Sequence, residues 1–548
     1  MNTPSLKPGI GQTSKNRRRG PVALLVAASL ALAACGGGGG DDSASGGATG
    51  STDVAGPSGG EVSRDTSLII AENEPPATFD PLQADNSTVD EVVIPAYDSL
   101  FTYDAAKALT GVLVTDWQVS EDGLTVTLTL RDDVTFHDGA KLTANDVKYT
   151  FDRIVRLGAG VASYLTSYES SEATSDTELV ITLSQADAVF LPSLTRVYVL
   201  NSALVEANAG DDDGQSWLAS NDAGSGPYVF KDYKSNQSAT FERYEGYWGG
   251  FSGQAQTVQF QYLSDQATQK AALEGGDIDI AMDIAPADWA SFEAAAGFTV
   301  NKADTNVALY VFFDMDNEVT ANAALREAIA YSYNYPQHIQ DILLGAGTAL
   351  VGPLPSGMQC FTEVPQPTYD PDKAREIVAA NGLEGTTVTM TYLEATTEME
   401  QAATLLQSNM ADVGLTLEVQ AVTYPTYAEM AAKAETRPQL GMIYAFPAFP
   451  DASAILYQNF NSQFIGAQNW GGYVNAEVDS LTNQAQTESD QTARCAAYAT
   501  VQEQIASDFV SLNLANSQIV SIMADRVQGY QYRSWHHQTV DVYAITVS

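Results

Sequence analysis

Apolar and polar residues alternate between positions 117 and 130, and this alternation predicts a pair of antiparallel strands. Every second residue from Leu124 to Leu130 is apolar, and a threonine fills each position between them. A strand with this period has one apolar face for the core and one polar face. Glu121-Asp122-Gly123 has the composition of a tight turn. We therefore expect a β-hairpin here, with a second turn at Asp138-Gly139.

The hydrophobic period changes from two to a helical one after position 142. Thr143 and Asp146 have the spacing of a capping box. Val147, Phe151 and Ile154 then recur at helical spacing and predict a helix with one apolar face.

Further helices and strands alternate later in the chain. Asp370-Pro371 predicts a helix start and Asn381-Gly382 its end, and a second helix is expected from Thr397, capped with Glu400, to Val413-Gly414. Strand-like runs are found at 67–71, 388–392 and 415–422. The alternation predicts a mixed α/β body with more than one sheet.

The first 34 residues have the pattern of a secretory signal. They contain basic residues and no acid, and they are apolar from Pro21 to Ala34. Leu32-Ala33-Ala34-Cys35 resembles the bacterial lipobox, which implies acylation of Cys35. We predict a signal peptide over 1–34 and a flexible Gly/Ser-rich tether over 35–65. The alternative is an ordinary signal peptide with an accidental cysteine.

The chain has 548 residues and a mass of 58.4 kDa, enough for about three or four domains. It has 68 acidic against 26 basic residues and a net charge of -42. Nucleic acid is excluded as a partner because phosphate binding needs clustered Lys and Arg. No apolar run after residue 34 approaches the length of a membrane span. We expect a location outside the cytoplasm, with attachment to the membrane through lipid.

Two cysteines remain after Cys35, namely Cys360 and Cys495. In an oxidising compartment they can form a disulfide, and the alternative is two separate buried thiols. The sequence leaves both possibilities open.

The chain lacks the residue constellations of an enzyme. Its histidines, at 137, 338, 536 and 537, match no zinc-binding spacing. Gly224-Ser225-Gly226-Pro227 lacks the spacing of a hydrolase nucleophile, and Gly345-Ala346-Gly347 lacks the third glycine of a dinucleotide loop. We therefore expect no catalytic residues, no cofactor and no metal site.

Aromatic residues are frequent in irregular segments late in the chain. Tyr424, Tyr444, Phe446 and Phe449 lie in or beside proline-containing segments. Amphipathic rings in loops can line a ligand cavity. The alternative is that they cover the core beneath long loops.

The order of motifs resembles the large solute-binding proteins of bacterial ABC importers, the family of dipeptide-, oligopeptide- and nickel-binding proteins. The resemblance covers residues of roughly 66 to 530. It is carried by segments that follow one another as in that family: Tyr97-Asp-Ser-Leu-Phe, Trp117 to Arg131, Val134-Thr-Phe-His-Asp-Gly139, Leu142 to Val147, Gly224-Ser-Gly-Pro-Tyr228, Tyr247-Trp248, Leu273 to Asp279, Leu325 to Ala330, Tyr369 to Ala374 and Tyr473 to Asp479.

This resemblance implies an α/β fold of the two-lobed periplasmic-binding-protein type (type II, cluster C), with an extra domain inserted in the first lobe. The first lobe is expected at about 66–108, 225–302 and 524–548. The inserted domain corresponds to about 109–224 and the second lobe to about 303–523. A ligand would lie between two lobes that close by a hinge.

The same resemblance implies the ligand-binding residues. It assigns ligand-facing positions to Asp85, Asn86 and Ser87, and a stacking aromatic to Tyr424. The acid that grips a peptide amine in oligopeptide binders is replaced by Ala448. A site without that acid holds no free α-amine unless another acid, such as Asp85 or Asp451, reaches it. The full set of predicted ligand contacts is Asp85, Asn86, Ser87, Tyr424, Tyr444, Phe446, Phe449 and Asp451.

We therefore expect a lipid-anchored binding protein, monomeric, that delivers a peptide or peptide-like solute to an ABC permease with its ATPase subunits. A non-peptide solute, such as an oligosaccharide or an opine, is the alternative ligand. Nickel is disfavoured because the ligand loops of the second lobe contain no histidine. A surface receptor or chaperone on the same fold is the alternative function, since fold alone does not prove function.

Overall fold

The computed structural model describes residues 63–83, 87–105, 107–394, 396–534 and 540–548. The predicted signal peptide, Cys35, Asp85, Asn86 and almost all of the predicted tether lie outside these residues. Within the described ranges, no helix has the length and apolar character needed to cross a membrane.

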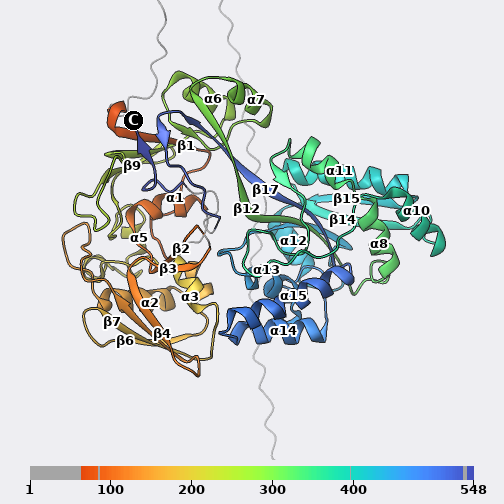
Figure 1. The fold of residues 1–548 in the computed structure, drawn as a ribbon, viewed down its shortest axis with the longest axis horizontal. Helices are drawn as coiled ribbons and strands as arrows, with labels where there is room; N and C mark the ends of the chain where they lie inside the picture. Colours follow the sequence, from red (N-terminus) through yellow and green to blue (C-terminus); the bar gives the residue numbers. More distant parts are fainter. Residues whose placement is uncertain (1–62, 84–86, 106, 395, 535–539) are drawn as a thin grey trace, which may run out of the picture. The chain divides into compact units, whose positions relative to one another are not determined.

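One large mixed sheet organises the molecule (Figure 1). We call one end the β15 side and the other the β8 side. The strands of the β15 side are β15 (Thr416–Val422), β14 (Thr387–Leu393) and β16 (Leu440–Ala445). The strands of the β8 side are β11 (Ile280–Ala281), β1 (Ser67–Glu72), β10 (Thr257–Tyr262), β9 (Ser238–Arg243) and β8 (Tyr228–Lys234).

Two long antiparallel strands, β12 (Phe298–Phe313) and β17 (Ser511–Ala524), join the two sides. They run through the middle of Figure 1, and the short strand β13 (Gly347–Thr348) pairs with β17. Their pairing register shifts between Asp304 and Ala308. A second register shift lies between Leu309 and Tyr310, so the connection between the two sides is continuous but irregular at two levels.

The end of β12 is apolar on both faces because both faces are covered. Leu309, Val311 and Phe313 pack into one core, and the alternate residues Tyr310 and Phe312 pack into another. A continuous apolar run is the pattern of such a two-sided strand.

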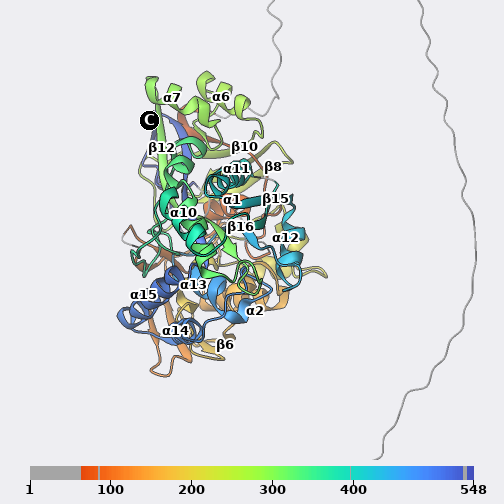
Figure 2. The ribbon, with the colours of Figure 1, turned by 90° about the vertical axis from the view of Figure 1, so that its right-hand side faces the viewer.

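Two groups of helices cover the β15 side (Figure 2). One core contains apolar residues of α8 (Ala323–Ser332), α10 (Pro371–Ala380) and α11 (Thr397–Asp412), and the short α9 (Tyr335–Gln337) adds Tyr335. The other core contains residues of α12 (Tyr424–Ala431), α13 (Ser453–Phe460), α14 (Ala476–Thr487) and α15 (Gln491–Ser507).

The sequence predicted a capping residue for two of these helices, and one of the two predictions is confirmed. Asp370 caps α10 as expected, because its carboxylate accepts the Lys373 N–H at 2.9 Å. The predicted capping role of Thr397 is wrong: Thr397 is the first helical residue of α11, and Thr396 occupies the N-cap position without a side-chain capping bond.

A separate four-stranded sheet contains the predicted hairpin. Its strands, in spatial order, are β4 (Val114–Val119), β5 (Thr125–Leu130), β7 (Glu178–Leu183) and β6 (Tyr168–Ala173). Val126, Leu128 and Leu130 are buried, as the alternation predicted, whereas Leu124 precedes β5 and is 37% exposed. The capping box is confirmed at α2 (Ala144–Leu157). The short helices that follow are α3 (Phe190–Ser193), α4 (Ser202–Ala207) and α5 (Gln215–Leu218).

The β8 side carries the remaining helices, α1 (Ser87–Ala96), α6 (Gln266–Gly275) and α7 (Pro286–Ala294). Two small ribbons pair β2 (Phe101–Tyr103) with β3 (Leu109–Gly111), and β18 (Val527–Gln528) with β19 (Thr546–Val547).

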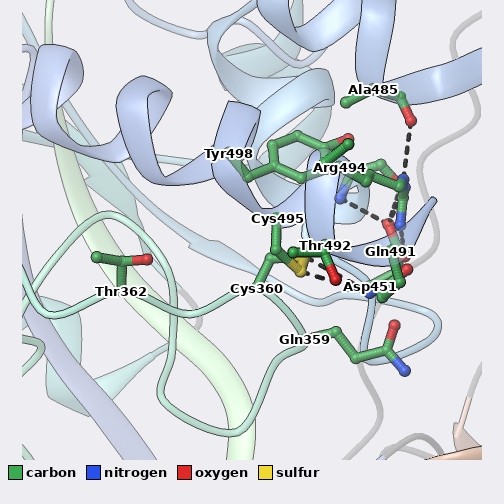
Figure 3. The surroundings of a disulfide bond; sticks show 12 residues. Gln359, Cys360, Thr362, Asp451, Ala485, Gln491, Thr492, Arg494, Cys495 and Tyr498 are labelled. Carbon is green, nitrogen blue, oxygen red and sulfur yellow. Dashed lines mark hydrogen bonds and ion pairs between the residues drawn. A yellow bond between two sulfur atoms is a disulfide. The ribbon is translucent and has the colours of Figure 1, made fainter. Parts of the chain in front are cut away.

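Cys360 and Cys495 form a disulfide with an S–S distance of 2.00 Å (Figure 3). The sequence did not decide whether these two cysteines pair, and in the structure they do. It joins the irregular segment after β13 to α15, across a sequence separation of 135 residues.

Candidate ligand-binding cleft

A cavity of about 430 Å³ opens where β12 and β17 pass between the two sides of the sheet, and we call it the main cavity. It has walls from three parts of the chain. The β8 side contributes Gln266, Met282, Asp283, Ile284, Pro286 and Trp289. The two connecting strands contribute Thr305, Val307, Ser517, Gln518, Ile519 and Val520, and the β15 side contributes Glu398, Tyr444 and Phe446.

Many of these residues follow the ends of strands or begin helices. Met282 follows β11, Phe446 follows β16, and Glu398 lies in the first turn of α11, just after β14. In open α/β sheets, ligands bind outside the carboxyl ends of strands. The main cavity lies just beyond the carboxyl ends of β11, β14 and β16.

A hydrogen-bonded chain fixes Glu398 at the wall of the main cavity. One carboxylate oxygen accepts from the Tyr444 hydroxyl at 2.6 Å, and the other lies 3.1 Å from His338 Nε2. The Tyr333 hydroxyl lies 2.6 Å from His338 Nδ1. Burial, and next the charge of Glu398, raise the pKa of the Tyr444 hydroxyl, which keeps it protonated as the donor. The carboxylate is therefore held in one position facing the cavity.

A second cavity of about 380 Å³ lies on the β15 side, and we call it the aromatic cavity. It shares Tyr444 and Phe446 with the main cavity, and the two rings lie 5.5 Å apart between centroids. Its lining residues are Leu393, Tyr424, Ile443, Tyr444, Ala445, Phe446, Ala454, Gln458, Asn459, Gln468 and Trp470.

Three of the predicted ligand-contact residues are brought together here. Tyr424, Tyr444 and Phe446 line the aromatic cavity. Tyr424 and Phe446 are 56% and 57% exposed, which leaves both rings open to a solute. Their contact with a ligand stays a prediction.

Phe449 and Asp451 lie elsewhere, since neither residue lines the main cavity or the aromatic cavity. Phe449 is 5% exposed and packs edge-on against Tyr164 at 6.0 Å. Asp451 is fully buried and forms a two-pronged ion pair with Arg494, in which Nη2 donates to Oδ1 at 2.8 Å (Figure 3). Its Oδ1 also accepts from the Ser453 N–H and hydroxyl.

The electrostatics of Asp451 explain this structural role. Burial alone would raise the pKa of its carboxyl group, but the Arg494 charge and the hydrogen bonds outweigh burial and lower that pKa. Asp451 is therefore a charged group already paired inside the protein, and it does not replace the acid missing at Ala448.

The predicted contacts at 85–87 cannot be placed on a cavity wall. Asp85 and Asn86 lie outside the described residues, and Ser87 is the first residue of α1. Their contact with a ligand also stays a prediction.

Sequence reasoning missed most of the main cavity. Gln266, Trp289, Thr305 and Glu398 come from segments far apart in the chain, and none belongs to a recognisable motif. The available signal was weaker: Glu398 follows the end of the strand predicted at 388–392. Within the described residues, no group of three or more His, Cys, Asp or Glu side chains could hold a metal ion.

Comparison with known proteins gives a consistent picture. Residues 108–467 match the family model described as bacterial extracellular solute-binding proteins, family 5 Middle. The chain is 27% identical over 485 residues to the probable D,D-dipeptide-binding periplasmic protein DdpA of Escherichia coli K12, covering 87% of this chain and 93% of that protein. It is 26% identical over 446 residues to heme-binding protein A of Haemophilus influenzae, covering 76% and 81%.

Solved structures share the fold at low sequence identity. HbpA2 from Haemophilus parasuis superposes with a TM-score of 0.79 at 18% identity, over 88% of this chain and 100% of that one. The periplasmic binding protein DppA from Helicobacter pylori, in complex with the peptide STSA, gives a TM-score of 0.72 at 21% identity, over 88% and 98%. These matches show the two-lobed fold of periplasmic binding proteins. The chain belongs to family 5 of the bacterial extracellular solute-binding proteins, which serve ABC transporters.

Proposed function

We propose that this protein captures a peptide or peptide-like solute between its two lobes and delivers it to the permease of an ABC importer. In this proposal lobe I comprises about 66–108, 225–302 and 524–548, and lobe II about 303–523. The four-stranded sheet belongs to a domain inserted in lobe I, at about 109–224.

The main cavity is the observation that carries the proposal. Its walls come from the β8 side, the β15 side and the two connecting strands. A solute in this position would touch both lobes at once. It would therefore bind the closed arrangement more tightly than the open one and shift the equilibrium toward closure. The register shift at Asp304–Ala308 lies beside the cavity residues Thr305 and Val307, where the connecting strands can bend.

The lining chemistry supports a solute with flat, weakly polar parts. Trp289, Tyr444 and Phe446 offer apolar faces, while Gln266 and Thr305 offer hydrogen-bonding groups. A few polar groups among apolar ones is the usual composition of a ligand site. None of the residues lining the two cavities is Lys or Arg, so an anionic solute would find no opposite charge in these walls.

Ala448 favours the alternative of a non-peptide solute, because the acid that holds a peptide amine in related binders is absent there. The names of related proteins include D,D-dipeptide, heme and glutathione binders, so relatedness alone does not choose between these ligands.

Small molecules released by denaturing the purified wild-type protein would test the proposal directly. Mass spectrometry should identify an amide-bonded compound, and re-addition of that compound should raise the unfolding temperature. Phe446→Ala should retain less of it than wild type, whereas Val474→Ala, which truncates an exposed residue outside both cavities, should retain as much. Release of a sugar or opine would favour the alternative solute class.

We also propose that Cys35 anchors the protein to the outer face of a membrane through lipid. Cys35→Ser should release the protein into the soluble fraction and abolish its labelling by fatty acid. Unchanged membrane retention of the variant would contradict the anchor.

A further inference from the structure

Polar side chains lie at one level of the sheet, beside the main cavity. Tyr262 of β10 is in register with Glu72 at the end of β1, and Ser521 of β17 is in register with Asn301 of β12. Cross-strand partners have their side chains on the same face of a sheet. Each pair therefore presents two polar groups together.

Met282 joins these two pairs to the main cavity. Ala281 of β11 is in register with Ala71 on one side and with Ile522 on the other. The next residues at that level are Glu72, Met282 and Ser521, and the Met282 N–H donates to the Ala71 carbonyl at 3.2 Å. We call the polar residues Tyr262, Glu72, Ser521 and Asn301, together with Met282 at their centre, the polar row. Met282 lines the main cavity, so the row meets the cavity at this residue, whereas the other four residues of the row are not part of the lining.

The polar row contains buried atoms that make no hydrogen bond. The atoms are the Tyr262 hydroxyl, Glu72 Oε1 and Asn301 Nδ2, and none has a partner among the residues that the structure describes, whereas the Ser521 hydroxyl lies within hydrogen-bonding reach of the Tyr530 hydroxyl. Tyr262 is 8% exposed and Ser521 is fully buried. Buried polar atoms are almost always hydrogen-bonded, so a group of unpaired ones indicates a missing partner.

A second carboxyl group faces Glu72 from the neighbouring helix. Glu91 of α1 lies within hydrogen-bonding reach of Glu72, and both residues are 4% exposed. Glu91 Oε2 also has no partner within the described part of the chain. The Tyr262 hydroxyl lies close enough to both carboxyl groups for their charges to act on it.

The charged groups that act on this pair are acidic, and one of them, Asp90, is itself paired with Arg196 at 2.8 Å. Glu72 is influenced by Asp283, and Glu91 by Asp90 and Glu74. Burial is the main cause that raises the pKa of both Glu72 and Glu91 well above the ordinary value. Buried carboxyl groups are ordinarily paired with a cation or kept neutral, and neither Glu72 nor Glu91 forms an ion pair with a described basic residue.

We infer that the polar row and Glu91 form a recess that receives a cationic nitrogen, a primary ammonium, of the solute held in the main cavity. The inference rests on the proposed function and specifies the solute class. An ammonium has three N–H donors and no acceptor, which suits two carboxyl groups and neighbouring hydroxyls. The recess would supply, in lobe I, the acid that is absent at Ala448 in lobe II. For a peptide this predicts that blocking the α-amine weakens binding.

Competition within a defined mixture tests the recess with the full-length protein. The mixture contains short peptides of Ala, Leu and Phe together with diamines, each paired with its isotopically labelled N-acetylated form. After equilibrium dialysis, mass spectrometry measures the ratio of free-amine to acetylated compound retained. Wild type should retain the free-amine form at least about tenfold better.

Matched variants separate a binding role from a structural one. Glu72→Gln/Glu91→Gln should lose this preference, while Glu74→Gln, which neutralises an exposed acid nearby, should keep it. Without solute, the double variant should unfold at the same or a higher temperature than wild type at neutral pH, because it removes two carboxyl groups whose charged form is disfavoured by burial.

Each remaining outcome counts against a specific claim. Equal retention of free and acetylated compounds by wild type, or an unchanged preference in the double variant, overturns the recess and leaves the proposed function intact. A lower unfolding temperature of the double variant with unchanged preference assigns the pair a structural role. Retention of no member of the mixture overturns both the recess and the peptide part of the proposed function.

Discussion

Asp451 and the Glu72–Glu91 pair are carboxyl groups shut away from solvent, yet their surroundings are opposite. Asp451 receives two donors from the Arg494 guanidinium and further hydrogen bonds from Ser453. Glu72 and Glu91 face each other, hydroxyl groups and further acids, with one oxygen of each unpaired among the described residues. The first arrangement satisfies a charge within the protein, whereas the second leaves a place for a charge from outside.

This difference shows how the molecule separates stability from recognition. The Asp451–Arg494 pair lies beside the Cys360–Cys495 disulfide, because Arg494 and Cys495 are adjacent on α15 (Figure 3). An ion pair and a covalent bond therefore hold the same part of the β15 side. On the β8 side, the acid pair lies near Met282 of the main-cavity wall, and burial disfavours the charged form of both carboxyl groups.

Breaking the disulfide should have the largest effect on the stability of the α15 region. The Cys360→Ala/Cys495→Ala variant should lose on the order of 5 kcal/mol of unfolding free energy, because the bridge closes a long loop in the unfolded chain. Denaturant titration of both proteins measures the difference. Two free thiols in unfolded, unreduced wild-type protein would contradict the bridge itself.

Arg494→Met should be the next most damaging change. It leaves the Asp451 carboxylate buried without its cation, which costs about 3–5 kcal/mol. Arg156→Met is a matched control, since its pair with Asp213 is exposed on both sides and should contribute at most about 1 kcal/mol. Equal losses of unfolding free energy in the two variants would contradict the expected difference between the buried and the exposed ion pair.

The two acidic sites should respond to pH in opposite directions. The folded pKa of Glu72 and Glu91 is raised, so stability is full below the ordinary glutamate pKa and is lost as pH rises through the folded value. Glu72→Gln/Glu91→Gln should therefore exceed wild type by about 1–3 kcal/mol near pH 8, with no difference near pH 4.

The folded pKa of Asp451 is lowered, so its stabilising contribution is present above the unfolded pKa and is lost as pH falls through the folded value. Asp451→Asn should accordingly be less stable than wild type at neutral pH, and the gap should narrow in acid. Urea unfolding at several pH values measures both variants. Parallel pH profiles for the two sites would refute the contrast between them.

Tyr424→Ala should have the smallest effect, and it acts on binding. Tyr424 lines the aromatic cavity on the β15 side, away from the recess, so its loss removes stacking area only. Calorimetry with the compound released from wild type should show binding weaker by roughly 1–3 kcal/mol, with the preference for a free amine retained. An unchanged affinity would place the solute outside the aromatic cavity.

Local patterns predicted much of the fold because their causes are local. The hairpin at Gly123, the Thr143 capping box and the Asp370 cap depend on residues a few positions apart. The same reasoning misplaced the cap at Thr397 by one residue, because two adjacent threonines offer the same side chain.

The candidate site was harder to predict because its causes are distant in sequence. The exposed aromatics Tyr424 and Phe446 stood out in irregular segments. The ion pair that occupies the Asp451 carboxylate, however, is formed with Arg494, which is 43 residues away in the sequence. Nothing in the sequence around Glu72 or Glu91 distinguishes a buried acid from a surface one, and their juxtaposition requires the packing of α1 on the sheet.

The position of β17 also has a consequence for the order in which the protein can fold. β17 lies between β12 and β11 at the centre of the large sheet, yet it consists of residues 511–524, whereas β1 comes from residues 67–72. Synthesis at about 5–20 residues per second separates the two strands by tens of seconds. During that time the early strands lack their central neighbour and the sheet cannot close. Late arrival of this strand therefore delays completion of the large sheet until nearly the whole chain has been made.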